Sequence, residues 1–242
     1  MSKIYTTEYD DELLRGMEEP RPWNITNEID RFITPTALLI DVGCGTCTKT
    51  LDLAKKVKSF WGVEPSTKMR AKVTAKISRQ KIANAHVIDG KAEDLPFPDN
   101  CCDILTSILA IHSASEFSRV LKPGGVAVME KLTELDKRKL KAFFGRDEKG
   151  LRGQFSEFAT GERIKRVRLE LETYFKSVRI QEGKWRAYLS TDGLKKLCQE
   201  TSIVRGFDRN RDAEALSLAI RHLKEEKGIC IEHHRILIIA VK

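Results

Sequence analysis

The sequence contains no apolar run near the roughly 18 residues that a membrane-spanning helix needs. Its first ten residues are polar and acidic, with neither the apolar core of a signal peptide nor a lipidation motif. Internal repeats and low-complexity segments are also missing. We therefore expect a cytoplasmic protein that does not insert into a membrane, and the sequence does not indicate its oligomeric state.

Cysteines are few, six in 242 residues, and only Cys44 and Cys47 have the C-x-x-C spacing of redox and metal sites. No second pair completes a zinc site. In a cytosolic chain of this size the cysteines are expected to be free thiols. The neighbouring His233 and His234 would point to opposite faces of a strand. The sequence therefore predicts no metal site.

Hydrophobic residues make up 41% of the chain and charged residues 32%, which suits one large α/β domain with additions and argues against disorder. The net charge is +8. Nearly all of this excess lies in residues 131–186, where roughly sixteen Lys and Arg face nine Asp and Glu. Such a region can attract RNA or another anionic partner, although a solvated helical face is the simpler interpretation.

Short apolar runs alternate with helical patterns in the first half of the chain. This order predicts right-handed crossovers and a parallel sheet. The expected strands are 37–42, 59–64, 85–89, 103–109 and 126–130, with helices at 48–57, 66–80 and 115–120. Beyond residue 131 we expect helices within 134–144, 162–174, 192–200 and 212–227, and strands at 177–180 and 236–241.

The chain is expected to divide into a short cap and one large domain. Residues 1–35 form a helical cap that the prolines of Glu19-Pro20-Arg21-Pro22 interrupt. Residues 36–242 form the main domain. Within it, 132–175 and 187–232 are expected to be helical cover over the carboxyl edge of the sheet, where open α/β sheets bind ligands.

Asp41-Val42-Gly43-Cys44-Gly45-Thr46 ends the first strand and opens the first helix, and glycines there let a ligand approach the backbone. A dinucleotide site would want a small residue in place of Thr48. The carboxylate of Asp41 would also repel a pyrophosphate. The same carboxylate attracts the cationic amino and sulfonium groups of S-adenosylmethionine (SAM), so the loop favours SAM.

Two further strand ends fit the same cofactor. Glu64 ends the second strand, where an acid accepts hydrogen bonds from both ribose hydroxyls. After the third strand comes Gly90-Lys91-Ala92-Glu93-Asp94-Leu95-Pro96-Phe97. There the backbone near Ala92 is placed to contact adenine, and a carboxylate of Glu93 or Asp94 to accept from its exocyclic amine.

These segments, together with Gly62-Val63-Glu64-Pro65-Ser66 and Arg119-Val120-Leu121-Lys122-Pro123-Gly124-Gly125, occur in one order. Over residues 37–131 the chain resembles the class I methyltransferases of the ubiquinone/menaquinone-biosynthesis-like (type 11) family. The resemblance implies a Rossmann-like sheet, mainly parallel with an antiparallel C-terminal strand, under an added helical cover. It also implies that SAM is the cofactor and S-adenosylhomocysteine the product. The implied cofactor-binding residues are Asp41, Gly43, Cys44, Gly45, Glu64, Pro65, Met69, Gly90, Ala92, Glu93 and Leu109, with the backbone of Leu109 or Ala110 near the methionine amine. Tyr5 or Tyr9, and Arg21, are implied to close over the cofactor.

The segment after the fourth strand departs from that family. The family has a longer helix-bearing segment, often opened by paired histidines, whereas this chain has Ile111-His112-Ser113-Ala114-Ser115-Glu116-Phe117-Ser118. This segment lines the acceptor side, so the acceptor of any one relative does not transfer to this chain. His112 is the candidate general base, and a packing role for it is equally consistent with the sequence.

Three functions remain open. The leading hypothesis is methyl transfer to a small molecule. The second is methylation of RNA or protein through the basic region 131–186, and the third is a SAM-binding protein without catalysis. No Pro-Cys dipeptide and no Asn/Asp-Pro-Pro-Tyr segment occurs, which argues against cytosine C5 and the common exocyclic-amine chemistries.

Overall fold

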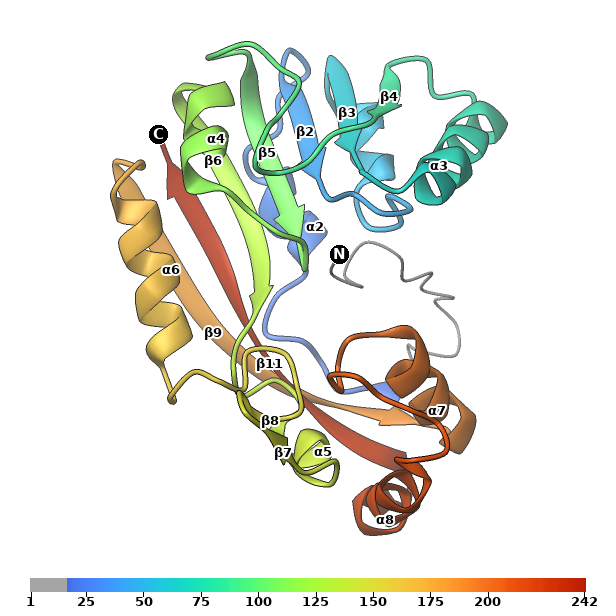
Figure 1. The fold of residues 1–242 in the computed structure, drawn as a ribbon. Coiled ribbons are helices and arrows are strands. Elements are labelled where there is room, and N and C mark those ends of the chain that lie inside the picture. Colours follow the sequence, from blue (N-terminus) through green and yellow to red (C-terminus); the bar gives the residue numbers. More distant parts are fainter. Residues whose placement is uncertain (1–16) are drawn as a thin grey trace. The chain divides into compact units, whose positions relative to one another are not determined.

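The computed structural model describes residues 17–242 and is built on one mixed sheet (Figure 1). Its strand order is β1-β9-β11-β6-β5-β2-β3-β4, with β10 paired to β11. The strands are β1 (Met17–Glu18), β2 (Leu38–Val42), β3 (Ser59–Val63), β4 (Ala85–Ile88), β5 (Cys102–Ile108), β6 (Leu121–Leu132), β9 (Ser177–Leu189), β10 (Lys224–Glu225) and β11 (Gly228–Val241). Strands β7 (Arg146–Asp147) and β8 (Gly150–Leu151) form a separate hairpin.

Strands β4, β3, β2, β5 and β6 are parallel to one another. The last strand, β11, is antiparallel to β6. Two hydrogen bonds at its end show this: the amide of Gly124 donates to the Lys242 carbonyl and the amide of Lys242 donates to the Gly125 carbonyl, each at 3.0 Å. The predicted fold class, a mainly parallel Rossmann-like sheet with an antiparallel C-terminal strand, is confirmed.

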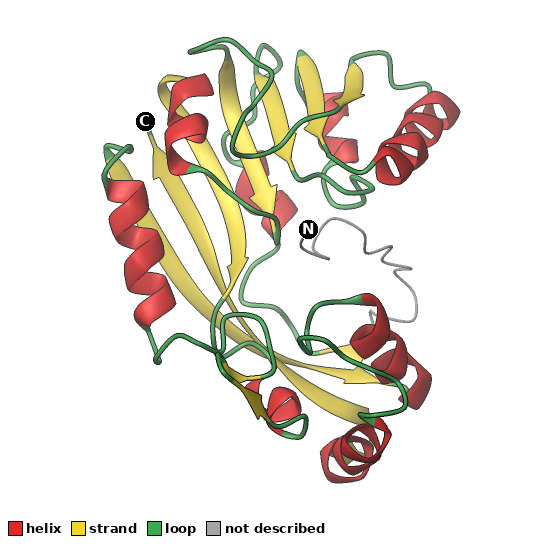
Figure 2. Cartoon of the chain, viewed as in Figure 1, coloured by secondary structure: helices red, strands yellow, loops and turns green. Residues whose placement is uncertain are grey.

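Helices lie before β2, between parallel strands and after β6 (Figure 2). They are α2 (Ile25–Asp30), η2 (Leu51–Lys56), α3 (Thr67–Gln80), α4 (Ala114–Val120), α5 (Arg138–Ala142), α6 (Glu162–Glu172), α7 (Thr191–Glu200) and α8 (Ala213–Leu223). The side chain of Ser66 caps α3 as predicted, since it accepts the Met69 amide. No helix in the described part of the chain is long and apolar enough to cross a membrane.

The helix expected at 48–57 is instead the short 3₁₀ helix η2. Cys47, just before it, has a left-handed backbone with φ 50°. Thr50 stands at the N-cap without a cap hydrogen bond from its side chain, and its hydroxyl donates to Asp41.

Other elements also differ from the sequence expectations. The first of the two helical pieces expected before residue 35 is replaced, where the structure describes it, by β1, which pairs with β9. Strand β9 continues to Leu189 rather than ending at 180, because Gly183, Trp185 and Ala187 alternate with exposed or half-buried residues. Strand β11 starts at Gly228 rather than 236, because its histidines and arginine are buried among polar partners.

The chain forms two compact units. Unit 1 comprises residues 1–22, 132–165 and 182–235, of which 17 onward are described, and unit 2 comprises 23–131, 166–181 and 236–242. Each has an apolar cluster of its own, around Phe60 and Ile104 in unit 2 and around Leu140 and Leu194 in unit 1. All the segments that match the methyltransferase motifs lie in unit 2.

Candidate functional site

Asp41 stands where three parallel strands bring their carboxyl ends together. It is paired in register with Gly62 of β3 and Thr106 of β5. Its carboxylate is buried and accepts the hydroxyl of Thr50 at 2.6 Å and that of Thr106 at 2.8 Å. Burial raises the pKa of Asp41 to about 6, although both hydroxyls favour the ionised form. Asp41 therefore joins β2, β5 and the start of η2.

The loop after β2 meets the turn after β5 at Gly43. Gly43 has φ +68°, and a Cβ built on it would lie 2.3 Å from the Cβ of Ala110. The two backbones approach this closely only because glycine has no side chain. Gly45, with φ +55°, has nothing within 4 Å of a built Cβ. The loop is thus packed on one side and open at Gly45.

Glu64 directly follows β3 and connects two loops. One of its carboxylate oxygens accepts the Gly45 amide at 3.0 Å, and the other accepts the Ser66 amide at 2.9 Å. Its side chain is largely buried. An acid at this strand end, beside an open glycine loop, has the position from which ribose hydroxyls are bound in dinucleotide folds.

The loop after β4 is held by helix α4. Arg119 donates to the carbonyls of Leu95 and Phe97 and to the carboxylate of Glu116. Glu116 in turn accepts the Leu95 amide at 2.8 Å. The sequence alone does not predict this contact between α4 and the loop, although the i, i+3 spacing of Glu116 and Arg119 indicates an ion pair on a helix.

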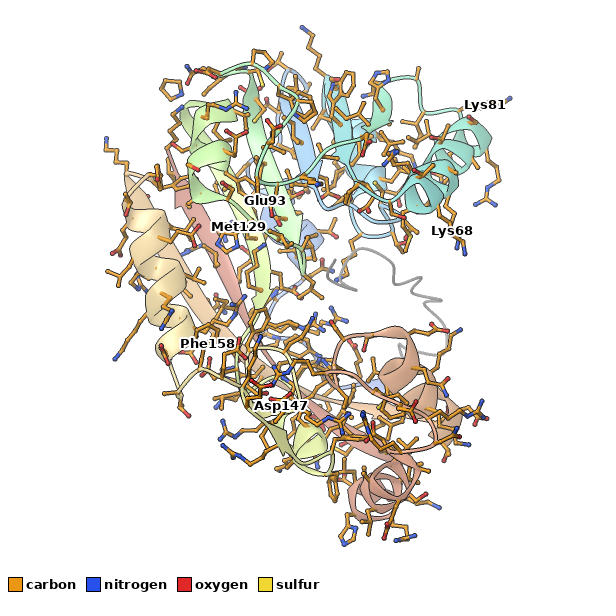
Figure 3. All side chains as sticks on the ribbon, viewed as in Figure 1. Lys68, Lys81, Glu93, Met129, Asp147 and Phe158 are labelled. Carbon is orange, nitrogen blue, oxygen red and sulfur yellow. The ribbon has the colours of Figure 1, made fainter. Side chains whose placement is uncertain are left out.

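Within this loop, the candidate cofactor contacts differ in exposure. Ala92 is buried, whereas Glu93, labelled in Figure 3, is exposed. At Gly90 a built Cβ would lie 2.8 Å from Val63, so this glycine allows close packing on β3. Asp94, the alternative to Glu93, is exposed as well, and the adenine contact expected of this loop stays a prediction.

The turn after β5 is fixed by two buried residues of β6. The Leu109 amide donates to the Glu130 carbonyl at 2.8 Å. Lys131 donates to the hydroxyl of Ser107 at 2.8 Å and to the carbonyl of Ala110 at 2.7 Å. Leu109 itself has φ +56° and is 37% exposed. The sequence does not indicate this contact of Lys131, because a lysine at the end of an apolar run is typical of an exposed strand end.

His112 follows this turn. Its Nε2 lies 3.4 Å from a carboxylate oxygen of Glu170 on α6, and its side chain is 12% exposed. The other oxygen of Glu170 accepts the Ala114 amide at 3.3 Å. The predicted role of His112 as a base remains a prediction.

The other candidates of the cofactor site are placed as follows. Pro65 is half-buried, and Met69 is buried at the start of α3. In unit 1, Arg21 pairs with Glu18 at 2.6 Å and lies 5.4 Å from the ring centre of Trp185. Tyr5 and Tyr9 lie outside the described residues. The cofactor role of these residues stays a prediction.

Cys44 and Cys47 are free thiols whose sulfur atoms both lie beside Gly62, at 2.7 and 3.3 Å from a built Cβ. The contact with Cys47, together with burial, raises the pKa of Cys44 above its ordinary value. A raised pKa disfavours the thiolate that redox and metal chemistry use. Among the described residues, no group of three or more His, Cys, Asp or Glu is arranged to hold a metal ion.

Residues 40–129, which include the strand ends described above, resemble known proteins. Residues 40–129 match a family model described as a methyltransferase domain, of type 11. A demethylmenaquinone methyltransferase of Geobacillus sp. (strain WCH70) is 32% identical over 99 residues, which cover 37% of this chain and 42% of that protein. An uncharacterised methyltransferase of Schizosaccharomyces pombe is 34% identical over 110 residues, covering 39% and 40%. The chain thus spans about two fifths of the length of these curated relatives.

The fold as a whole also has solved counterparts. The YcgJ protein of Bacillus subtilis superposes with a TM-score of 0.62 at 20% identity, over 90% of this chain and 97% of that one. A putative methyltransferase of Bacillus halodurans gives a TM-score of 0.60 at 17% identity, over 90% and 98%. These structures share the fold, and the sequence match lies over the strand ends described above. The resemblance to the type 11 methyltransferases is confirmed for residues 40–129, and the chain shares a Rossmann-like fold with these structures.

Proposed function

We propose that this protein is a SAM-dependent methyltransferase that acts on a small molecule and releases S-adenosylhomocysteine. The observation that carries the proposal is the arrangement at the ends of β2 and β3, where Glu64 holds the Gly45 amide beside a glycine loop. The match of residues 40–129 to a methyltransferase domain supports it. We place the reaction in the cytosol, where the free cysteines of the chain are stable.

Each part of the cofactor has a group that suits it. Glu64 would bind the ribose hydroxyls, and the backbone near Ala92, with Glu93, would bind adenine. Gly43 lets the loop pack against Ala110, Gly45 leaves room for the methionine portion, and the carbonyl of Leu109 would accept a hydrogen bond from its amine. Asp41 supplies negative charge beneath the loop, which favours a cationic ligand over a pyrophosphate.

When bound, SAM supplies a methyl group on a sulfonium that is a good leaving group. The residues of this chain then position the acceptor near that methyl in line with the breaking bond, and exclude water. A base is needed only where the attacking atom keeps its proton, and His112 is the candidate.

A small-molecule acceptor is supported by the names of the curated relatives, which include demethylmenaquinone methyltransferases. The RNA alternative depends on the positive charge of residues 131–186, but several of these basic side chains form ion pairs or hydrogen bonds within unit 1. Lys137 pairs with Asp136, and Arg152 pairs with Asp212 at 2.7 Å. Lys141 is buried and donates to a backbone carbonyl.

The experiment that tests the proposal uses SAM with a radiolabelled methyl group. Purified protein is incubated with cell extract, with and without RNase, and the products are separated by size. Label in small molecules that does not respond to RNase supports the proposal. RNase-sensitive label in large species would favour the RNA alternative, and binding of SAM without any transfer would favour a non-catalytic protein.

A further inference from the structure

We propose that Glu170 positions His112 as the proton acceptor of the methyl transfer, an inference that rests on the proposed function. The pair joins two elements far apart in the sequence, the segment after β5 and helix α6. Both residues lie in unit 2, as do the glycine loop and Glu64. Nothing in the sequence pattern of α6 singled out Glu170.

The geometry brings the Glu170 carboxylate to the segment that starts α4. One oxygen lies 3.4 Å from Nε2 of His112, and the other accepts the Ala114 amide at 3.3 Å. The separation from His112 is an ion-pair distance rather than a hydrogen bond, and catalytic contacts commonly tighten into hydrogen bonds when the ligands are bound. His112 is mostly buried, whereas Glu170 is 44% exposed.

The backbone around His112 is fixed on both sides. Lys131 binds the carbonyl of Ala110, and the hydroxyl of Ser107 donates to the Ile111 carbonyl at 3.1 Å. After it, the Ser113 side chain caps α4 by accepting the Glu116 amide. His112 is thus held two residues beyond Ala110, whose Cβ packs against Gly43 of the glycine loop. This places an imidazole on the acceptor side of the proposed cofactor site.

The carboxylate determines what the imidazole can do. Glu170 beside Nε2 favours the tautomer that carries its hydrogen there. Proton transfer to His112 then has to occur at Nδ1. The charges that act on Glu170 are those of His112 and Lys131, and contact with His112 lowers the pKa of Glu170. An imidazolium formed at His112 would in turn be stabilised by this carboxylate.

The step balances as follows. The attacking O, N or C atom of the acceptor forms its bond to the methyl carbon as the sulfur–methyl bond breaks and its electron pair returns to sulfur. The proton of the acceptor passes to Nδ1 of His112. The imidazolium formed is then stabilised by the negative charge of Glu170.

The first test needs no acceptor. Protein with ¹⁵N-labelled histidine is titrated by NMR, and His112 is assigned by the signals lost in His112→Gln. We expect the Nε2–H tautomer in the neutral imidazole, and roughly tenfold weaker proton affinity in Glu170→Gln. Glu172→Gln is the matched control, since Glu172 lies on the same helix, is exposed and pairs with Arg168. An Nδ1–H tautomer, or an unchanged titration in Glu170→Gln, overturns the proposal.

The second test measures the pH profile of methyl transfer to the acceptor fraction found with labelled SAM. We expect Glu170→Gln to lower kcat by roughly ten- to a hundredfold with unchanged SAM affinity, and Glu170→Asp to recover part of it. A carboxylate that only caps α4 would leave the pH profile unmoved. Full kcat in His112→Gln would refute the role of His112 as the base and leave the methyltransferase function intact. No methyl transfer by the wild type would refute the proposed function, and the NMR titration would still decide whether Glu170 pairs with His112.

Discussion

The carboxylate of Glu64 accepts the amide of Gly45 at 3.0 Å, so the acid that directly follows β3 is joined to the loop after β2. The same side chain also accepts the amide of Ser66. Two loops that bound the proposed cofactor site are therefore held by one carboxylate.

Replacing Glu64 with Gln or Ala should lower SAM affinity by tenfold or more, about 1.4 kcal/mol, since the ribose contact and the loop connection are both lost. Isothermal titration calorimetry measures the change. Asp52→Asn is a suitable control, because Asp52 is exposed and pairs only with Lys55 among the described contacts. Wild-type affinity in both Glu64 variants would remove Glu64 from the site.

Asp41→Asn should stabilise the protein without ligand at neutral pH. The folded state raises the pKa of Asp41 from 3.8 to about 6, so it binds this proton more tightly than the unfolded state does. The ionised carboxylate therefore destabilises the fold increasingly from about pH 4 to 6, reaching roughly 3 kcal/mol. Urea denaturation at pH 5 and 7.5 should show a gain in Asp41→Asn that is larger at pH 7.5; a variant less stable at both pH values contradicts this.

SAM affinity should fall as the pH drops through about 6, because protonated Asp41 no longer attracts a cation. Calorimetric titrations between pH 5 and 7.5 would give the profile. In Asp41→Asn the affinity should be weaker at pH 7.5, by roughly tenfold, and nearly independent of pH. An equally steep profile in that variant would assign the pH dependence to another group.

Gly43→Ala and Gly45→Ala form a matched pair. Both residues have positive φ, so each variant carries the cost of a left-handed side-chain residue, roughly 1–2 kcal/mol. Only Gly43→Ala adds a clash, 2.3 Å from Ala110. We expect it to lose more stability and to abolish measurable SAM binding, as read from denaturation and calorimetry. Equal losses in the two variants would show that the contact with Ala110 does not matter.

Asp136→Asn should destabilise the protein by roughly 3–5 kcal/mol, since it leaves the buried Lys137 without its counter-charge. Lys137 and His233 hold the pKa of Asp136 well below its usual value, against the effect of burial. Its contribution is therefore present above about pH 4 and is lost as the pH falls further. Urea midpoints at pH 7 measure the loss. The exposed Asp192→Asn should change stability by less than about 0.5 kcal/mol; a similarly small change for Asp136→Asn would show that the pair is not needed.

The sequence by itself determined the parallel half of the sheet and the residues at its strand ends. Buried parallel strands are continuous apolar runs, and the glycines of 43–45 and the acid at 64 occupy fixed places along the chain. These features are local, so they can be recognised without knowing what lies beside them.

Only the tertiary structure decided which side chains share a contact. The bonds of Asp41 to Thr50 and Thr106, the approach of Ala110 to Gly43 and the pairing of His112 with Glu170 all join separate elements. The full length of strand β11 could not be predicted for the same reason. His233 and Arg235 are buried in it because His233 contacts Asp136 and Arg235 lies over the ring of Trp185. Burial of a polar side chain depends on partners that the local sequence does not contain.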